Sequence, residues 1–254
     1  MWLRQVALVA HERDPVVEQL EKVLGLKTAY NDPEVGIFGL INAVMPVGGE
    51  FLEVVTPVKD DASALRYLHR RGGDAGYMLI FEVEDAKAHR TRVLGLGARQ
   101  IAALDKRYVF THFHPGDFGG VLTSIDSVTG VDNWFDRDSD WPPAGPDWRS
   151  AKSTNAKGIL GASVQTKAPA ALAARWGELL GVKVEEGRLG PELRLARGFV
   201  RFVEPVDEDG TGVIGLDISM TDTGRALSEA GKLGLPVSGN AVDICGVRFA
   251  LHGA

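Results

Sequence analysis

The segment FLEVVTPV at residues 51–58 returns in the second half of the chain as FVRFVEPV at residues 199–206. In the first copy, alternation along a strand places Glu53 on one face and Leu52 and Val54 on the other. A buried carboxylate without a partner is costly. The pattern therefore leaves three interpretations of Glu53: a metal ligand, a catalytic base, or a core acid satisfied by hydrogen bonds.

Three further pairs of segments occur in the same order in both halves. VVEQLEKVLGLKTAY from residue 16 corresponds to LAARWGELLGVKVEE from residue 172, GYMLIFEVE from residue 76 to GVIGLDISM from residue 212, and GGVLTSID from residue 119 to CGVRFALH from residue 245. Together with the first pair, the offsets are 156, 148, 136 and 126 residues, which decrease steadily. The second half is therefore interpreted as a shortened copy of the first.

Each half divides again into two units with the order βαβββ. A helix is expected over 14–24, ending at Gly25, and another from an Asp85 N-cap to about residue 94, before Gly95 and Gly97. The remaining strands of the first half are expected near 27–31, 36–46, 50–58, 98–102, 107–113 and 120–126. The unit is used four times, and the last copy is abbreviated.

These boundaries predict an N-terminal domain at residues 1–127, a linker at 128–157 and a C-terminal domain at 158–254. The linker is rich in Asp, Pro, Gly and Ser and has no sustained periodicity. The indole rings of its tryptophans either fix the linker over the two domains, or one of them covers the opening of a ligand site or a dimer interface. They lie seven residues apart, at Trp134, Trp141 and Trp148.

A βαβββ unit used in pairs resembles the vicinal oxygen chelate superfamily, which includes glyoxalase I, extradiol dioxygenases, methylmalonyl-CoA epimerase and bleomycin-resistance proteins. The stretches that carry the resemblance are LRQVALVA, FLEVVTPV, GYMLIFEVEDA and HPGDFGGVLTSID, with their counterparts in the second half. The resemblance implies an α+β fold in which tandem βαβββ modules form two glyoxalase-like domains with curved mixed sheets. In that family the metal ligands lie on the first and fourth strands of each unit, which here correspond to Gln5, Glu53, Met78 and Ser124.

The second unit has therefore lost both ligand types. A thioether is a poor ligand for hard divalent ions, and a neutral hydroxyl is a weak one. In the C-terminal domain Arg201 would repel a cation, and the other three positions that correspond to ligands hold no usual ligand. We therefore expect no tightly bound metal and no cofactor, with a degenerate divalent-metal site left in the first domain. The C-terminal positions that correspond to ligands are Gly161, Arg201, Gly215 and Ala250.

Glu53 is the leading candidate for a catalytic residue, as a general base whose pKa burial would raise. His112 and His114 share a strand face and are further candidates, either as proton shuttles or as ligands of a relocated metal. The alternative is that Glu53 bonds to a glutamine across the sheet and that His114 only caps a turn. Candidate ligand-binding residues are Gln5, Tyr77, Met78, Ser124 and Arg201.

Net charge and composition limit the classes of partner that we expect for this chain. The chain has 254 residues and a net charge of −6, which disfavours nucleic acid and anionic membranes as partners. The single cysteine, Cys245, excludes an internal disulfide and is expected to be a buried thiol. No apolar stretch reaches the roughly 18 residues that a membrane helix needs. A cytoplasmic location is expected, and homodimer formation is left open.

The leading functional hypothesis is an N-terminal cleft that binds a small, partly apolar organic molecule and abstracts a proton, or isomerises, next to a carbonyl group. A metal-dependent lyase or dioxygenase is the second hypothesis. A non-catalytic protein that sequesters a ligand, like bleomycin-resistance proteins, is the third.

Overall fold

A computed structural model describes residues 1–208 and 210–254. The first module contains β1 (Trp2–Val9), α1 (Arg13–Leu24), the 3-10 helix η1 (Pro33–Phe38), β2 (Leu40–Val47) and β3 (Glu50–Pro57). After α2 (Ser63–Arg71), the second contains β4 (Ala75–Glu82), α3 (Ala86–Gly95), β5 (Gln100–Asp105), β6 (Tyr108–Phe113), η2 (Pro115–Phe118) and β7 (Leu122–Val128).

The linker contains only the short helices η3 (Pro142–Ala144) and η4 (Trp148–Ala151). The third module contains β8 (Ala156–Gln165), α4 (Pro169–Leu180), β9 (Val184–Gly187), β10 (Gly190–Arg194) and β11 (Phe199–Val203). The fourth contains β12 (Gly212–Met220), α5 (Thr223–Lys232), β13 (Val237–Ser238), β14 (Ala241–Ile244) and β15 (Val247–Gly253).

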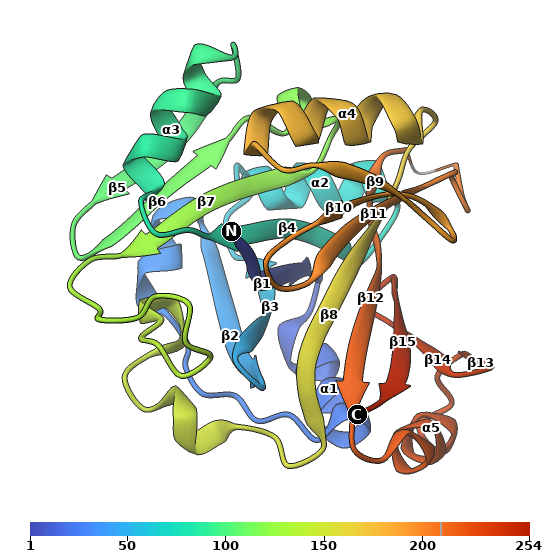
Figure 1. Cartoon of the computed structure of the whole chain (residues 1–254). Coiled ribbons are helices and arrows are strands. Elements are labelled where there is room, and N and C mark those ends of the chain that lie inside the picture. Colours follow the sequence, from blue (N-terminus) through green and yellow to red (C-terminus); the bar gives the residue numbers. More distant parts are fainter. Residues whose placement is uncertain (209) are drawn as a thin grey trace.

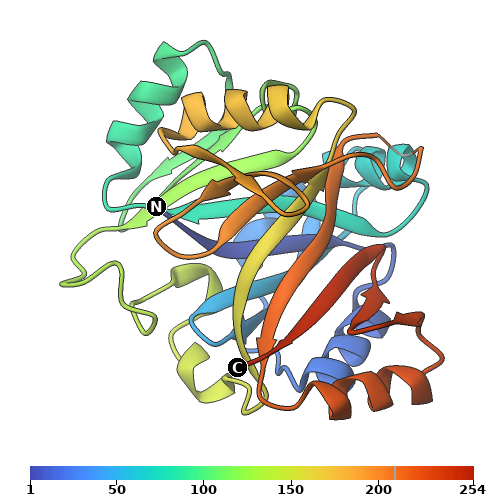
Figure 2. The ribbon, with the colours of Figure 1, turned by 45° about the vertical axis from the view of Figure 1, so that its right-hand side comes forward.

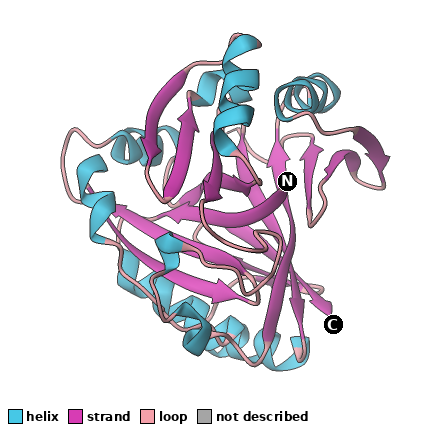
Figure 3. Cartoon of the chain, turned by 60° about the vertical axis from the view of Figure 1, so that its left-hand side comes forward, coloured by secondary structure: helices cyan, strands magenta, loops and turns pink. Residues whose placement is uncertain are grey.

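In all four modules the first strand pairs with the last, which confirms the repeat seen in the sequence, although the first module has one strand fewer than the others. The first and last strands of each module run parallel: β1 with β3, β4 with β7, β8 with β11, and β12 with β15. Within each half the two modules meet through antiparallel first strands. The result is two strongly curved mixed sheets with helices on their outer faces (Figures 1 and 3).

The two sheets are joined where β4 meets β12, at the pair Gly76 and Val213. A Cβ atom on Gly76 would lie 2.4 Å from the carbonyl oxygen of Val213, so only glycine permits this approach. Helices from the two halves also lie side by side, α1 with α5 and α3 with α4 (Figures 1 and 2).

One hydrophobic cluster contains residues of both halves and holds the domains together. Trp176 of α4 packs edge-on against Phe81 of β4 and Phe202 of β11, with ring centroids 6.2 and 5.4 Å away. Leu52 and Val54 of β3 belong to this cluster. A second cluster fills part of the concave face of the N-terminal sheet.

Local signals explain the helix boundaries. α1 ends at Gly25, whose φ of 69° is the left-handed conformation that favours glycine. The Asp85 side chain accepts hydrogen bonds from the amides of Lys87 and Ala88 and so caps α3, as predicted.

Two predictions from the sequence were wrong. No strand forms over 27–31, where Tyr30 makes only an isolated bridge to Val44. The proline at residue 33 fixes φ, and Asp32 caps the short helix η1, so the strand expected from residue 36 begins at Leu40. The helix α2 was not predicted, since its nine residues lie in a segment to which no element was assigned from the sequence.

The linker packs into the concave face of the N-terminal sheet, next to β2 (Figure 1). Trp141 and Trp148 are 1% exposed, whereas Trp134 is half-buried. Among the described helices, none combines the length and apolar character needed to cross a membrane.

Candidate functional site

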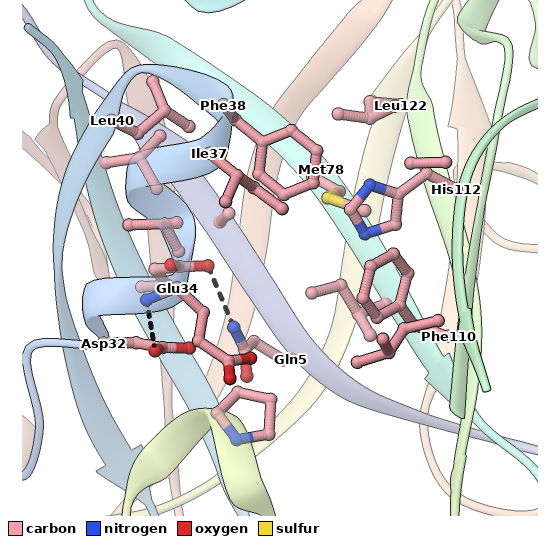
Figure 4. Close-up of a pocket in the computed structure, with 18 of the residues that line it drawn as sticks. Gln5, Asp32, Glu34, Ile37, Phe38, Leu40, Met78, Phe110, His112 and Leu122 are labelled. Carbon is pink, nitrogen blue, oxygen red and sulfur yellow. Dashed lines mark hydrogen bonds between the residues drawn. The ribbon is translucent and has the colours of Figure 1, made fainter. Parts of the chain in front are cut away.

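A cavity of about 570 Å³ lies on the concave side of the N-terminal sheet. η1 and β5 form two of its sides, and most of its wall is apolar (Figure 4). The apolar and aromatic residues in the wall include Val35, Ile37, Phe38, Leu40, Met78, Ile80, Ile101, Leu104, Phe110 and Leu122. A mainly apolar cavity with a few polar groups is typical of a site for a small organic molecule.

Glu53, on β3, is one of the polar groups in this wall and is 6% exposed. Its carboxylate accepts hydrogen bonds from the amide nitrogens of Gln5, at 2.9 Å, and Asn42, at 2.7 Å. Gln5 lies on β1, and Asn42 lies on β2. Glu53 is therefore a buried carboxylate that two neutral amides hold in place.

The orientation of both amides is determined by groups that can only donate. The indole nitrogen of Trp141 donates to the Gln5 oxygen at 2.6 Å, so the Gln5 nitrogen must face Glu53. The backbone amide of Asp32 donates to the Asn42 oxygen at 2.7 Å, which turns the Asn42 nitrogen toward Glu53 in the same way.

Burial raises the pKa of the Glu53 carboxyl above its usual value, while the hydrogen bonds from Asn42 and Gln5 oppose this effect. The nearby charge of Asp32 raises the pKa further. A carboxylate with a raised pKa is a stronger base than an exposed one, which is the property that a general base needs.

His112, on β6, lies in the cavity wall with Phe110, across the cavity from Asp32 and Glu34 (Figure 4). Its ring stacks on Phe110 with centroids 4.5 Å apart. Burial lowers the pKa of His112 to about 4. The imidazole is therefore neutral near pH 7, with one N–H donor and one acceptor nitrogen.

Met78 and Tyr77 also line the cavity. Ser124 is fully buried and is not among the lining residues. It pairs with Ile80 as Glu53 pairs with Ala7, so it occupies the corresponding position of the second module. Its hydroxyl, however, donates to Asp126 and lies 3.2 Å from the Thr111 carbonyl.

His114 and Arg201 are not in the cavity wall. The His114 ring caps η2, where its Nδ1 accepts from the Gly116 amide at 3.1 Å, the structural role that we weighed as the alternative. Arg201 lies in the C-terminal domain, where it forms ion pairs with Glu192, at 2.8 Å, and Asp217, at 3.4 Å.

Sequence reasoning missed several polar residues around the cavity. Asn42 is a lone polar side chain in the apolar run LINAVMPV, which is a weak signal. Asp126 is fully buried, accepts from the hydroxyl of Tyr108, and has a pKa raised to about 7 by burial. Trp141 was noted in the linker, but no sequence signal connects it to Gln5.

The residues do not fit the metal site that the family implies. Across residues 1–208 and 210–254, no group of three or more His, Cys, Asp or Glu side chains could hold a metal ion. Gln5 would have to ligate through its oxygen, which already accepts from Trp141, and Met78 offers only a thioether.

The comparisons with known proteins agree with this architecture. No family model matches the sequence. The 4-hydroxymandelate synthase of Streptomyces coelicolor, a two-domain protein of the superfamily, superposes with a TM-score of 0.66 at 19% identity, over 92% of this chain and 75% of that one.

Two epimerases match one half of the chain. The ethylmalonyl-CoA/methylmalonyl-CoA epimerase of Cereibacter sphaeroides is 26% identical over 135 residues, which are 50% of this chain and 97% of that protein. Methylmalonyl-CoA epimerase of Mycobacterium tuberculosis is 22% identical, with a TM-score of 0.46, over 50% of this chain and 88% of that one. The chain therefore shares with the 4-hydroxymandelate synthase a fold of two tandem glyoxalase-like domains with curved mixed sheets.

Proposed function

We propose that the N-terminal cavity binds a small, largely apolar carbonyl compound and that Glu53 removes a proton from the carbon next to its carbonyl group. The observation that carries this proposal is the environment of Glu53. Its carboxylate is buried in a cavity wall, two oriented amides hold it, and burial raises its pKa. The relative from Cereibacter sphaeroides is named as an epimerase, and epimerisation is a proton-transfer reaction of this class.

The proposed step balances within the cavity. The proton passes from the α-carbon to a Glu53 oxygen, and the C–H electron pair moves into an enolate whose oxygen carries the charge. In this proposal the neutral ring of His112, which lines the same cavity, donates an N–H hydrogen bond to that oxygen. Return of the proton from Glu53 to the same face of the carbon gives back the ligand, and return to another carbon gives an isomer; an epimer would form only if a second acid supplied a proton to the opposite face.

The charge of the wall supports a neutral ligand. Three carboxyl groups, from Asp32, Glu34 and Glu53, face the cavity, against one lysine, Lys106. A negative wall disfavours a polyanion such as a coenzyme A thioester. The apolar remainder of the wall suits an aliphatic or aromatic body.

Deuterium exchange tests the proposal. The protein is incubated in D₂O with neutral ketones and esters (cyclohexanone, propiophenone and ethyl 2-methylacetoacetate), with methylmalonyl-CoA for comparison, and loss of the α-proton signal is followed by ¹H NMR. We expect exchange of at least one neutral compound and a fall of about 10² to 10⁴-fold in Glu53→Gln, the usual contribution of a general base. Glu21→Gln, which changes an exposed carboxylate of α1 outside the cavity wall, is the control and should retain exchange.

A sequestering protein is the second candidate, because both Glu53 oxygens already accept hydrogen bonds. A compound that binds in the cavity, as seen by chemical-shift changes at wall residues, but exchanges no proton would support sequestration. Exchange that persists unchanged in Glu53→Gln would contradict the base assignment.

A further inference from the structure

We infer that Trp141 takes the place of a metal ion as the partner of Gln5, so that the linker forms part of the N-terminal site and keeps Glu53 a metal-free carboxylate of fixed orientation. The inference concerns this chain's own hydrogen bonds and does not require that the proposed reaction occurs. It assigns to the linker a role that the fold alone does not give it.

The first step is the chemistry of the amide. A glutamine binds a cation through its oxygen, and that oxygen would have to point at the same place as a Glu53 oxygen. Here the Gln5 oxygen accepts from the Trp141 indole at 2.6 Å, and the nitrogen lies 2.9 Å from Glu53. Rotating the amide would place its oxygen against the carboxylate and its NH₂ against the indole N–H. Trp141 and a cation are therefore mutually exclusive partners of Gln5.

The second step is the rigidity of Trp141. Its ring is 1% exposed, stacks on Phe51 with an interplanar angle of 12°, and meets Tyr108 edge-on at 5.6 Å. Just before it, both the carbonyl and the hydroxyl of Ser139 accept from Arg4 of β1, at 3.0 and 3.1 Å. These contacts fix the linker in the concave face and hold the indole N–H where it meets Gln5.

The linker also contains a tryptophan that can serve as a control for Trp141. Trp148 is also 1% exposed and also packs on Phe51, edge-on at 4.9 Å. Within the described part of the chain, its indole nitrogen has no hydrogen-bond partner. Trp148→Phe therefore removes a similar volume without the bond to Gln5, which separates the role of the N–H from that of the ring.

The first experiment measures the pKa of Glu53 by ¹³C NMR of the full chain. Trp141→Phe frees the Gln5 amide to rotate and weakens its donation to Glu53, so the pKa of Glu53 should rise relative to wild type. Trp148→Phe should leave it unchanged. Equal changes in the two variants would overturn the inference, because the ring volume alone would then account for the effect.

The second experiment adds Co²⁺ or Mn²⁺ alone and measures binding by isothermal titration calorimetry. Met78→His supplies a third donor in the wall of the cavity that Gln5 and Glu53 also line. In that background Trp141→Phe should tighten binding of one ion per chain at least about tenfold, about 1.4 kcal/mol, and Trp148→Phe should not. Equal affinity with and without Trp141 would overturn the inference.

A variant that fails to fold does not leave the inference untested. In the wild-type protein, the indole N–H of Trp141 should exchange slowly with solvent, as a buried hydrogen-bonded group does. Gln5→Leu should shift that ¹⁵N–¹H resonance and leave that of Trp148 in place. An unchanged Trp141 resonance would contradict the bond on which the inference rests. None of these readouts depends on proton exchange in a ligand, so failure here is distinguishable from failure of the proposed function.

Discussion

Glu53 in the N-terminal domain and Arg201 in the C-terminal domain occupy corresponding positions of the repeat, opposite Ala7 and Ser163 of the neighbouring parallel strand. Neutral amide donors surround the acid, and two carboxylates bind the arginine. Repetition of the topology therefore does not conserve the chemistry of the concave face.

The second difference lies in how each concave face is filled. Gln5 corresponds to Gly161, over which the Phe199 ring lies so closely that a Cβ atom on the glycine would be 2.4 Å from it. In the N-terminal domain that position keeps a polar side chain beside an open cavity. In the C-terminal domain an aromatic ring and ion pairs occupy these positions, whereas the N-terminal face has a cavity beside them.

The largest expected effect breaks the C-terminal arrangement. Arg201→Met removes the shared partner of Glu192 and Asp217, two largely buried carboxylates. We expect a loss of about 3 kcal/mol in the free energy of unfolding, at the lower end for a broken buried pair, because Arg194 and His252 still contact these acids. Urea unfolding at pH 7 measures the change.

Glu53→Gln provides the comparison, since an isosteric neutral side chain replaces an acid whose pKa is raised by burial. Its unfolding free energy should fall by about 1 to 2 kcal/mol, less than in Arg201→Met, because the new NH₂ group must face one of the two amide nitrogens that Gln5 and Asn42 direct to this position. Similar losses in the two variants would show that the two faces do not differ in the way proposed here.

The repeat of the strands, the faces of β3 and the helix ends at Gly25 and Asp85 could be predicted because they depend on local periodicity and capping. The position of Glu53 followed from the same alternation. The contact between Gln5 and Trp141 could not, because it joins residues 136 positions apart through a linker without periodicity. Short segments such as α2 escaped prediction because nine residues give too little pattern.

The next effect concerns the pH dependence of stability that arises from Asp126, a fully buried acid of the N-terminal domain. Burial raises the pKa of Asp126 to about 7, from about 3.8 in the unfolded chain. A raised pKa means that its contribution to stability is complete below the unfolded value and is lost as the pH rises through the folded one. The contribution of Asp126 to wild-type stability should therefore fall between about pH 4 and 7.

Asp126→Asn should remove about 2 kcal/mol of that fall, less than the full pKa shift implies, because Glu82, whose pKa is raised to about 8, titrates over the same range. Ser124→Ala deletes one hydrogen bond to the same acid and is the control that should retain the slope. Urea midpoints at half-unit pH steps measure the slopes. An identical slope in Asp126→Asn would refute the assignment.

The smallest expected effect concerns His112, whose ring lies in the wall of the N-terminal cavity. Its pKa is lowered from 6.5 to about 4, so the folded state holds the neutral ring while the unfolded chain binds a proton. The contribution of the neutral His112 ring to stability should consequently be lost as the pH falls below about 6.5. Phenylalanine keeps the stacking on Phe110 and removes the titration. The difference in unfolding free energy between His112→Phe and wild type should therefore be about 1 kcal/mol more favourable to the variant at pH 5 than at pH 7. His114→Ala, outside the cavity, is the control. If both variants show the wild-type pH dependence, burial does not lower the pKa of His112, and the assignment of His112 as a ring held neutral by the cavity wall fails.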